Sequence, residues 1–341
     1  MGSTFLGGFH LYTVYFKEKM KKTLKKIKIS SIDAKDKTFI YTFPVKIDEL
    51  RESIKKVSLI NPVILYEYNG KHRIISGLKR ILAVKSLSFD TIDAFVYESG
   101  SISELEAFLI SIYDNLSIRR LNNIEKSKIL NKLKKYYNLE DEEIIKDFMP
   151  AIGLECSKKL LYGYFALSKF DNNLKEHIVI RDIPIKTLSL LASVSDEKLS
   201  LISEIVIKLN PGLNKIKELV RMVDEIIEKN VISVEKFRLD LGVDGVLKND
   251  KLTLSQKWEK IISSLRKKRF PMWSKIEKNL LSNVSSFNLP KNMHFRYPPY
   301  LEGDKFKIEA EFSSSDELKI LGRKLIDISK TKELSEIIKL I

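Results

Sequence analysis

The stretch of residues 50–80 constrains this chain most, because it ends in a glycine beside two cations. The stretch begins with a run of apolar residues at helical spacing. Three short segments follow it in order: Asn61-Pro-Val-Ile-Leu, Asn69-Gly and Ile74-Ile-Ser-Gly-Leu-Lys-Arg. These patterns predict a helix, a strand, a two-residue hairpin turn, a second strand and the start of a helix. Gly77 can take the positive φ that such a turn needs. Free helix N–H groups beside Lys79 and Arg80 would suit an anion.

Length and charge limit the class of protein. A chain of 341 residues favours two or three domains, and 44% hydrophobic residues supply enough apolar material for packed cores. The net charge of +15 predicts a polyanionic partner, nucleic acid first and an acidic membrane surface second.

Other classes are excluded by what the sequence lacks. Cys156 is the sole cysteine, so an internal disulfide framework and a cysteine metal cluster are ruled out. The four histidines are scattered without ligand spacing, and no apolar run approaches the ~20 residues that cross a bilayer. Positive charges follow the apolar stretch 5–16 rather than precede it, which argues against a secretory signal. We expect a cytoplasmic protein.

Composition divides the chain into four parts with an overall α+β class. We expect a basic extension over residues 1–24, a small α+β domain over 25–102, an all-helical domain over 103–235 and a small α+β region of unknown role over 236–341. In the first domain Ile27, Ile29 and Ile32 alternate as a strand, and Phe39–Phe43 is expected to continue that layer. In the last region, residues 295–312 predict a hairpin and residues 315–325 a helix packed on it.

The helical domain contains a candidate DNA-reading element. Asn122 with Glu125 three residues later predicts a capping box. Further on, an acidic helix start at residues 140–143, a break at Pro150 and Gly153, and a new helix capped by Ser157 suggest a helix-turn-helix. The residues at its exposed end would be Ser157, Lys158, Lys159 and Tyr162, with the lysines on phosphates. An ordinary helical hairpin with a solvated basic face is the alternative.

Several of these stretches together resemble the N-terminal region of ParB-type partition proteins. The matching stretches are Leu50-x-x-Ser-Ile-Lys, Pro62-Val-Ile, Ser76-Gly-x-Lys-Arg-x-x-Ala, Asp114-Asn and Leu121-Asn-x-Ile-Glu. The resemblance covers roughly residues 25–235, and the C-terminal region does not share it. It implies CTP binding with Mg²⁺, and binding of double-stranded DNA through the helix-turn-helix. We also expect a homodimer.

The resemblance also implies which residues form each site. Nucleotide binding falls on Ser76, Gly77, Lys79, Arg80 and Asn115. The metal falls on Asp114 and Asn115, where Asp114 stands in place of a glutamate.

Two positions depart from the family pattern. Leu78 replaces the glutamate of the glycine turn, and leucine can neither accept a proton nor polarise water. We therefore expect nucleotide binding with weak or absent hydrolysis, so that the chain is at most a weak CTPase, or else a turn that is purely structural. The basic residue that follows Asn115 in the family is replaced by Ile118, although Arg119 and Arg120 are adjacent.

Three functional hypotheses follow. The first is a ParB-like DNA-binding protein, gated by CTP, acting in plasmid or chromosome partition or as a regulator on a mobile element. The second is a nucleotide-dependent enzyme on the scaffold that ParB shares with sulfiredoxin, although the glycine turn carries no cysteine and Leu78 removes the obvious carboxylate. The third is a protein-interaction module that has lost its ligand.

Overall fold

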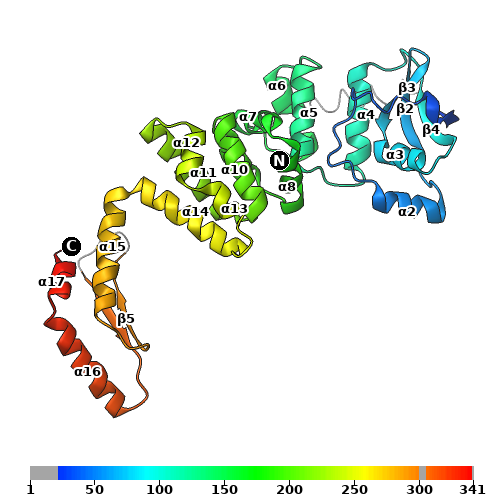
Figure 1. Cartoon of the computed structure of the whole chain (residues 1–341). Helices are drawn as coiled ribbons and strands as arrows, with labels where there is room; N and C mark the ends of the chain where they lie inside the picture. The colour runs from blue at the N-terminus through cyan, green and yellow to red at the C-terminus, as the bar shows by residue number, and fades with distance from the viewer. Residues whose placement is uncertain (1–21, 299–304, 340–341) are drawn as a thin grey trace, which may run out of the picture. The chain divides into compact units, whose positions relative to one another are not determined.

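The computed structural model describes residues 22–298 and 305–339, without the side chains of 271–275 and 277. Most of the basic extension expected over residues 1–24 lies outside these ranges. The chain divides into two compact units, residues 1–203 and 204–341 (Figure 1). Strands with helices in the first unit, and a largely helical body after them, confirm the α+β class. The boundaries predicted after residues 24, 102 and 235 stay a prediction.

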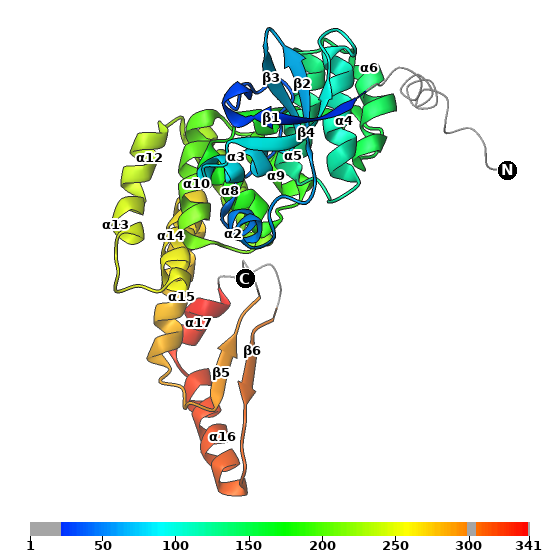
Figure 2. The same cartoon turned by 90° about the vertical axis from the view of Figure 1, so that its right-hand side faces the viewer.

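The first unit begins with a four-stranded sheet of order β1-β4-β2-β3, whose strands are labelled in Figure 2. The elements here are β1 (Thr23–Lys28), α2 (Asp48–Val57), β2 (Val63–Tyr68), β3 (Lys71–Ser76), α3 (Leu78–Ser86), β4 (Thr91–Tyr97) and α4 (Glu104–Leu116). Parallel pairing joins β2 to β4, whereas β1 with β4 and β2 with β3 are antiparallel. The predicted two-residue turn between β2 and β3 is present, with φ of 50° at Asn69 and 71° at Gly70.

Burial explains why these residues form the sheet. Ile27, Ile29 and Ile32 are each 8% exposed and pack with α3 and the central strands, as their alternation predicts. The strand itself ends at Lys28, and a 3₁₀ turn follows it over residues 29–31.

The expectation that Phe39–Phe43 forms a further strand is wrong. Hydrogen bonds to α4 and to Asn122 hold this segment instead. The Tyr41 hydroxyl donates to the Ser111 carbonyl at 2.9 Å, and Asn122 Nδ2 donates to the Phe43 carbonyl at 2.8 Å. Tertiary contacts thus replace sheet pairing here.

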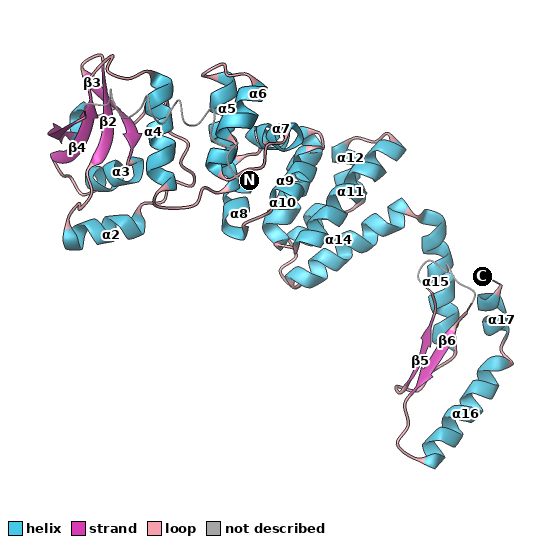
Figure 3. Cartoon of the chain, turned by 180° about the vertical axis from the view of Figure 1, so that it is seen from behind, coloured by secondary structure: helices cyan, strands magenta, loops and turns pink. Residues whose placement is uncertain are grey.

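Helices complete the first unit. They are α5 (Asn123–Lys135), α6 (Asp141–Glu143), a π turn over residues 144–148, a 3₁₀ turn over Pro150–Ile152, α7 (Lys158–Ala166), α8 (Asn172–Arg181), α9 (Ile185–Ala192) and α10 (Asp196–Leu209), whose last residues belong to the second unit (Figure 3). The predicted capping box is confirmed, because Asn122 accepts the Glu125 N–H and Glu125 accepts the Asn122 N–H. A Ser157 cap is confirmed as well, with Oγ accepting the Leu160 N–H at 3.3 Å.

The second unit is helical and ends in a small α+β lobe. Its further elements are α11 (Leu213–Asn230), α12 (Val234–Asp240), α13 (Val243–Leu247), α14 (Leu254–Arg269), α15 (Pro271–Ser286), β5 (Met293–Arg296), β6 (Lys307–Ala310), α16 (Ser315–Ser329) and α17 (Lys332–Ile338). The predicted hairpin is confirmed by antiparallel pairing of β5 with β6, and the helix after it runs four residues beyond expectation (Figure 2).

Ion pairs use much of the positive charge at the end of α14. Arg266, Lys268 and Arg269 each reach a carboxylate of α11 or α12. No helix within residues 22–298 and 305–339 is both long and apolar enough to cross a membrane.

Candidate functional site

The turn between β3 and α3 requires glycine. Gly77 has φ 99° and ψ 20°, a left-handed conformation that L side chains rarely adopt. A Cβ at this position would lie 2.7 Å from Cγ1 of Val63. The first backbone bond of the helix runs from the Ile81 N–H to the Gly77 carbonyl, so the preceding N–H groups lie at the positive end of the helix dipole. No side chain caps this end.

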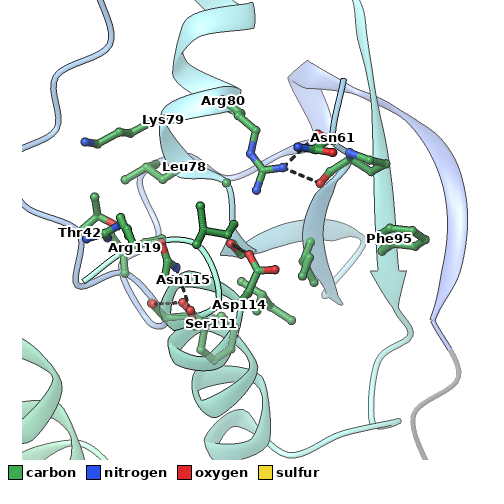
Figure 4. Close-up of a pocket in the computed structure, with 18 of the residues that line it drawn as sticks. Thr42, Asn61, Leu78, Lys79, Arg80, Phe95, Ser111, Asp114, Asn115 and Arg119 are labelled. Atoms are coloured by element: carbon green, nitrogen blue, oxygen red, sulfur yellow. Dashed lines mark hydrogen bonds between the residues drawn. The ribbon is translucent and has the colours of Figure 1, made fainter. Parts of the chain in front are cut away.

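A cavity of about 600 Å³ opens at this turn (Figure 4). Its walls come from segment 39–42, residues 61–62, the turn at Gly77 and the C-terminal end of α4. The charged residues that line it, within the described part of the chain, are the cations Lys22, Lys79, Arg80 and Arg119 and one carboxylate, Asp114. Four cations and a helix N-terminus against one carboxylate favour an anionic ligand.

Arg80 is anchored to the loop before β2. Its Nη1 donates to the carbonyl oxygens of Asn61 at 3.0 Å and Pro62 at 2.7 Å, and Figure 4 shows the side chain directed at this loop. Burial lowers the pKa of Arg80 from its usual value, and the charge of Asp114 acts in the opposite direction. Because arginine stays protonated in proteins, Arg80 remains a fixed cation at the cavity wall.

The three polar residues predicted beside the glycine turn lie together in the cavity. Ser76 Oγ donates a hydrogen bond to Oδ2 of Asp114, which links the end of β3 to α4. Asn115 Nδ2 donates to the Ser111 carbonyl at 2.8 Å, so its amide is oriented within α4. Carboxylate and amide oxygens are ligand types that Mg²⁺ accepts. No cluster of three or more ligating side chains occurs among the described residues, so a metal here would need oxygens from its ligand.

Arg119 is a charged cavity residue that the sequence analysis did not assign to a site. Its guanidinium forms two hydrogen bonds to Glu125, at 2.6 Å and 2.9 Å. Burial alone would lower the pKa of Arg119, but these bonds and the charge of Glu125 outweigh burial and raise the pKa. Ile118, which replaces the family's basic residue, is 74% exposed. The neighbouring arginine therefore contributes a cation to this wall.

Glu125 is buried, with 1% exposure, and each of its oxygens accepts two hydrogen bonds. Besides Arg119, the donors are the N–H groups of Phe43 at 3.1 Å and Asn122 at 3.2 Å. The signal for this pair was present in the sequence as the capping box, although the box alone does not reveal that its carboxylate is buried. A buried carboxylate needs a cationic partner, and Arg119 is that partner.

The candidate DNA-reading residues lie apart from the cavity, on α7. Lys158, Lys159 and Tyr162 are exposed, whereas Leu161 and Tyr164 form the buried face. The π turn and the 3₁₀ turn, followed by Gly153 at φ 70°, make the predicted break before this helix. The Tyr162 hydroxyl donates to Oδ2 of Asp141 at 2.8 Å, and this bond raises the pKa of Tyr162. Tyr162 is thus fixed to the preceding short helix.

The sequence predictions therefore divide into two groups. Those for nucleotide and metal name six residues that line one cavity: Ser76, Gly77, Lys79, Arg80, Asp114 and Asn115. Those for DNA name Ser157, Lys158, Lys159 and Tyr162, which lie at or near the start of α7.

Comparison with known proteins shows what the N-terminal part of the chain is similar to. The family model of the ParB N-terminal domain matches residues 16–116, a shorter span than the resemblance predicted from sequence. A probable chromosome-partitioning protein ParB of Campylobacter jejuni is 32% identical over 98 residues, which cover 29% of this chain and 34% of that protein. A nucleoid occlusion protein of Halalkalibacterium halodurans is 25% identical over 163 residues, covering 47% and 54%.

One similar solved structure is a C-terminally truncated ParB of Caulobacter crescentus in complex with the centromeric parS site. The match covers 58% of this chain and 98% of the ParB chain, with 17% sequence identity and a TM-score of 0.34. The chain spans between a third and about half of the length of the two curated relatives. The chain is therefore ParB-like over residues 16–116, the span that the model of the ParB N-terminal domain matches.

Proposed function

We propose that this protein binds duplex DNA, either in plasmid or chromosome partition or as a regulator on a mobile element, and that CTP with Mg²⁺ regulates the binding. The cavity beside Gly77 is the observation that carries the nucleotide part of this proposal. Its volume suits a small-molecule ligand, and its charge favours phosphate groups.

The residues of the cavity fit a nucleoside triphosphate. Backbone N–H groups at the start of α3, together with Lys79 and Arg119, would bind phosphate oxygens. Arg80 would hold the loop before β2 against the turn while keeping its charge near the phosphates. Asp114 and Asn115 would supply oxygens to Mg²⁺, which is commonly bound by one or two carboxylates together with substrate phosphates.

Hydrolysis is not expected to be the main activity. Leu78 is 4% exposed and packs in the core that α3 forms with the sheet. An apolar side chain at this position offers neither a base nor a hydrogen-bond acceptor for an attacking water. The nucleotide would then act by binding and release, with turnover slow or absent.

The DNA part of the proposal rests on the exposed basic start of α7 and is tested by salt dependence. We expect the double variant Lys158→Gln/Lys159→Gln to bind duplex DNA more weakly than the wild type. The slope of log K against log salt should fall by roughly 2, because each lost phosphate contact removes about 0.9. Fluorescence anisotropy measures this slope between roughly 50 and 200 mM salt, a range in which phosphate contacts change the affinity strongly.

A matched control removes the same charge elsewhere. Lys208→Gln/Lys229→Gln acts on two lysines that pair with glutamates four residues earlier, at 2.8 Å and 3.5 Å. This control should leave the slope unchanged. Equal slopes for the α7 variant and the wild type would rule out α7 as the DNA-binding element.

A further inference from the structure

Four lysines gather where α5 meets segment 33–43 and α8. Lys128 and Lys132 lie one helical turn apart on α5. Nζ of Lys132 donates to the carbonyl oxygens of Thr38, at 2.7 Å, and of Lys37, which brings Lys37 beside it. Because α5 packs against α8, Lys175 lies close enough to Lys128 for their charges to repel. Positive charge is therefore concentrated at one place in the first unit.

These ammonium groups have no carboxylate partner within ion-pair distance among the described residues. Their polar contacts are to neutral groups instead. Nζ of Lys37 donates to the Ala34 carbonyl at 3.3 Å and Nζ of Lys175 to the Ser168 carbonyl at 3.2 Å, and Nζ of Lys128 lies 4.6 Å from the centre of the Phe43 ring.

The acids nearest to the cluster already have other partners. Asp36 pairs with Arg73 at 3.1 Å, and Glu125 is bound to Arg119. Asp171 accepts the Leu174 N–H at the start of α8. All three carboxylates act on the lysines through their charge, Glu125 on Lys128, Asp36 on Lys132 and Asp171 on Lys175, but none forms an ion pair with them.

The proton affinities of the lysines agree with this geometry. Burial, together with the charges of Lys175 and Lys37, lowers the pKa of Lys128 despite the opposite effect of Glu125. Burial also lowers the pKa of Lys132 to about 8, with Asp36 opposing the shift and Lys128 adding to it. The pKa of Lys175 is lowered by burial too, and the charge of Asp171 opposes that shift. A bound anion would relieve both the desolvation and the repulsion.

We propose that Lys37, Lys128, Lys132 and Lys175 form a phosphate-binding site, separate from the nucleotide cavity and from α7. The phosphate would be a phosphodiester of nucleic acid or a free phosphate. Convergent ammonium groups bind either, because lysine recognises phosphate as a point charge without reading the group to which it is attached. The site goes beyond the function proposed above, which uses none of these lysines.

The test compares Lys128→Gln/Lys175→Gln in the full chain with the matched control Lys208→Gln/Lys229→Gln. The first arm measures the salt dependence of binding to a duplex of random sequence. A slope lower by roughly 2 in the cluster variant alone, at about 0.9 for each phosphate contact, would support the site and identify its phosphate as DNA backbone. In the second arm, the thermal midpoint is measured with and without inorganic phosphate at constant ionic strength. If phosphate raises the thermal midpoint of the wild type and of the control but not that of the cluster variant, the site binds free phosphate.

Two further variants keep the result interpretable. Both arms are repeated with Lys37→Gln. Because the Lys37 side chain is exposed, this variant is expected to keep the fold. Lys158→Gln/Lys159→Gln, measured in parallel, separates this site from α7. If neither arm distinguishes the cluster variants from the control, the phosphate site is overturned, while a lower slope for the α7 variant would still support the proposed function.

Discussion

Replacing Glu125 with alanine is expected to lower the free energy of unfolding by about 3–5 kcal/mol, the usual cost of breaking a buried ion pair by removing one partner. The variant would leave Arg119 without its carboxylate, and would leave the N–H groups of Phe43 and Asn122 without their acceptor. Urea unfolding of the full chain, followed by circular dichroism, measures the change.

Glu106 provides the matched control, because it occupies the same position of a capping box at the start of α4. Its carboxylate accepts the Ser103 N–H, but it is not fully buried, and no arginine among the described residues pairs with it. Glu106→Ala should therefore cost only about 1 kcal/mol, which is typical of a lost cap. Similar losses for the two variants would mean that the Arg119 pair adds little to stability.

Replacing Gly77 with alanine is expected to cost about 2–5 kcal/mol. A left-handed backbone costs an L residue roughly 1–2 kcal/mol, and forcing a methyl group into a packed site costs roughly 1–3 kcal/mol more. The clash is with Val63, a fully buried residue of β2 that has little room to move. Binding of any ligand at the start of α3 should weaken as well, because the turn would have to shift.

Gly70→Ala separates the two contributions. Gly70 also has a positive φ, 71°, but a Cβ there would meet nothing within 4 Å. Only the backbone cost of roughly 1–2 kcal/mol should appear. If both alanine variants unfold at the same urea concentration, close contact with Val63 is not what requires glycine at the turn.

Local patterns predicted much of the fold and six of the residues that line the cavity. The hairpin turn at Gly70, the strand-to-helix turn at Gly77 and the capping box at Asn122 all depend on residues within a few positions of one another. Such signals are readable because the backbone conformation and the residue type are linked locally.

Contacts between distant residues explain what the sequence did not predict. Segment 39–43 looked like a strand, but bonds from residues about 70–80 positions away hold it outside the sheet. The role of Arg119 depends on the burial of Glu125, and burial follows from how α5 packs rather than from the capping pattern. The lysine cluster joins positions 37, 128, 132 and 175, a spacing that no local motif marks. The expected homodimer stays a prediction.

The most direct test of the central claim is the thermal midpoint of the full chain with and without CTP and Mg²⁺, with ATP and GTP as controls. At a hundredfold excess over Kd, a ligand that binds only the folded state stabilises it by about 2.7 kcal/mol, which is readily measured. We expect CTP, but not ATP or GTP, to raise the thermal midpoint. The rise should be smaller in Lys79→Gln than in the wild type, and in Lys56→Gln, on α2, it should equal that of the wild type. No rise with any of the three nucleotides would contradict the claim that this cavity binds a nucleotide.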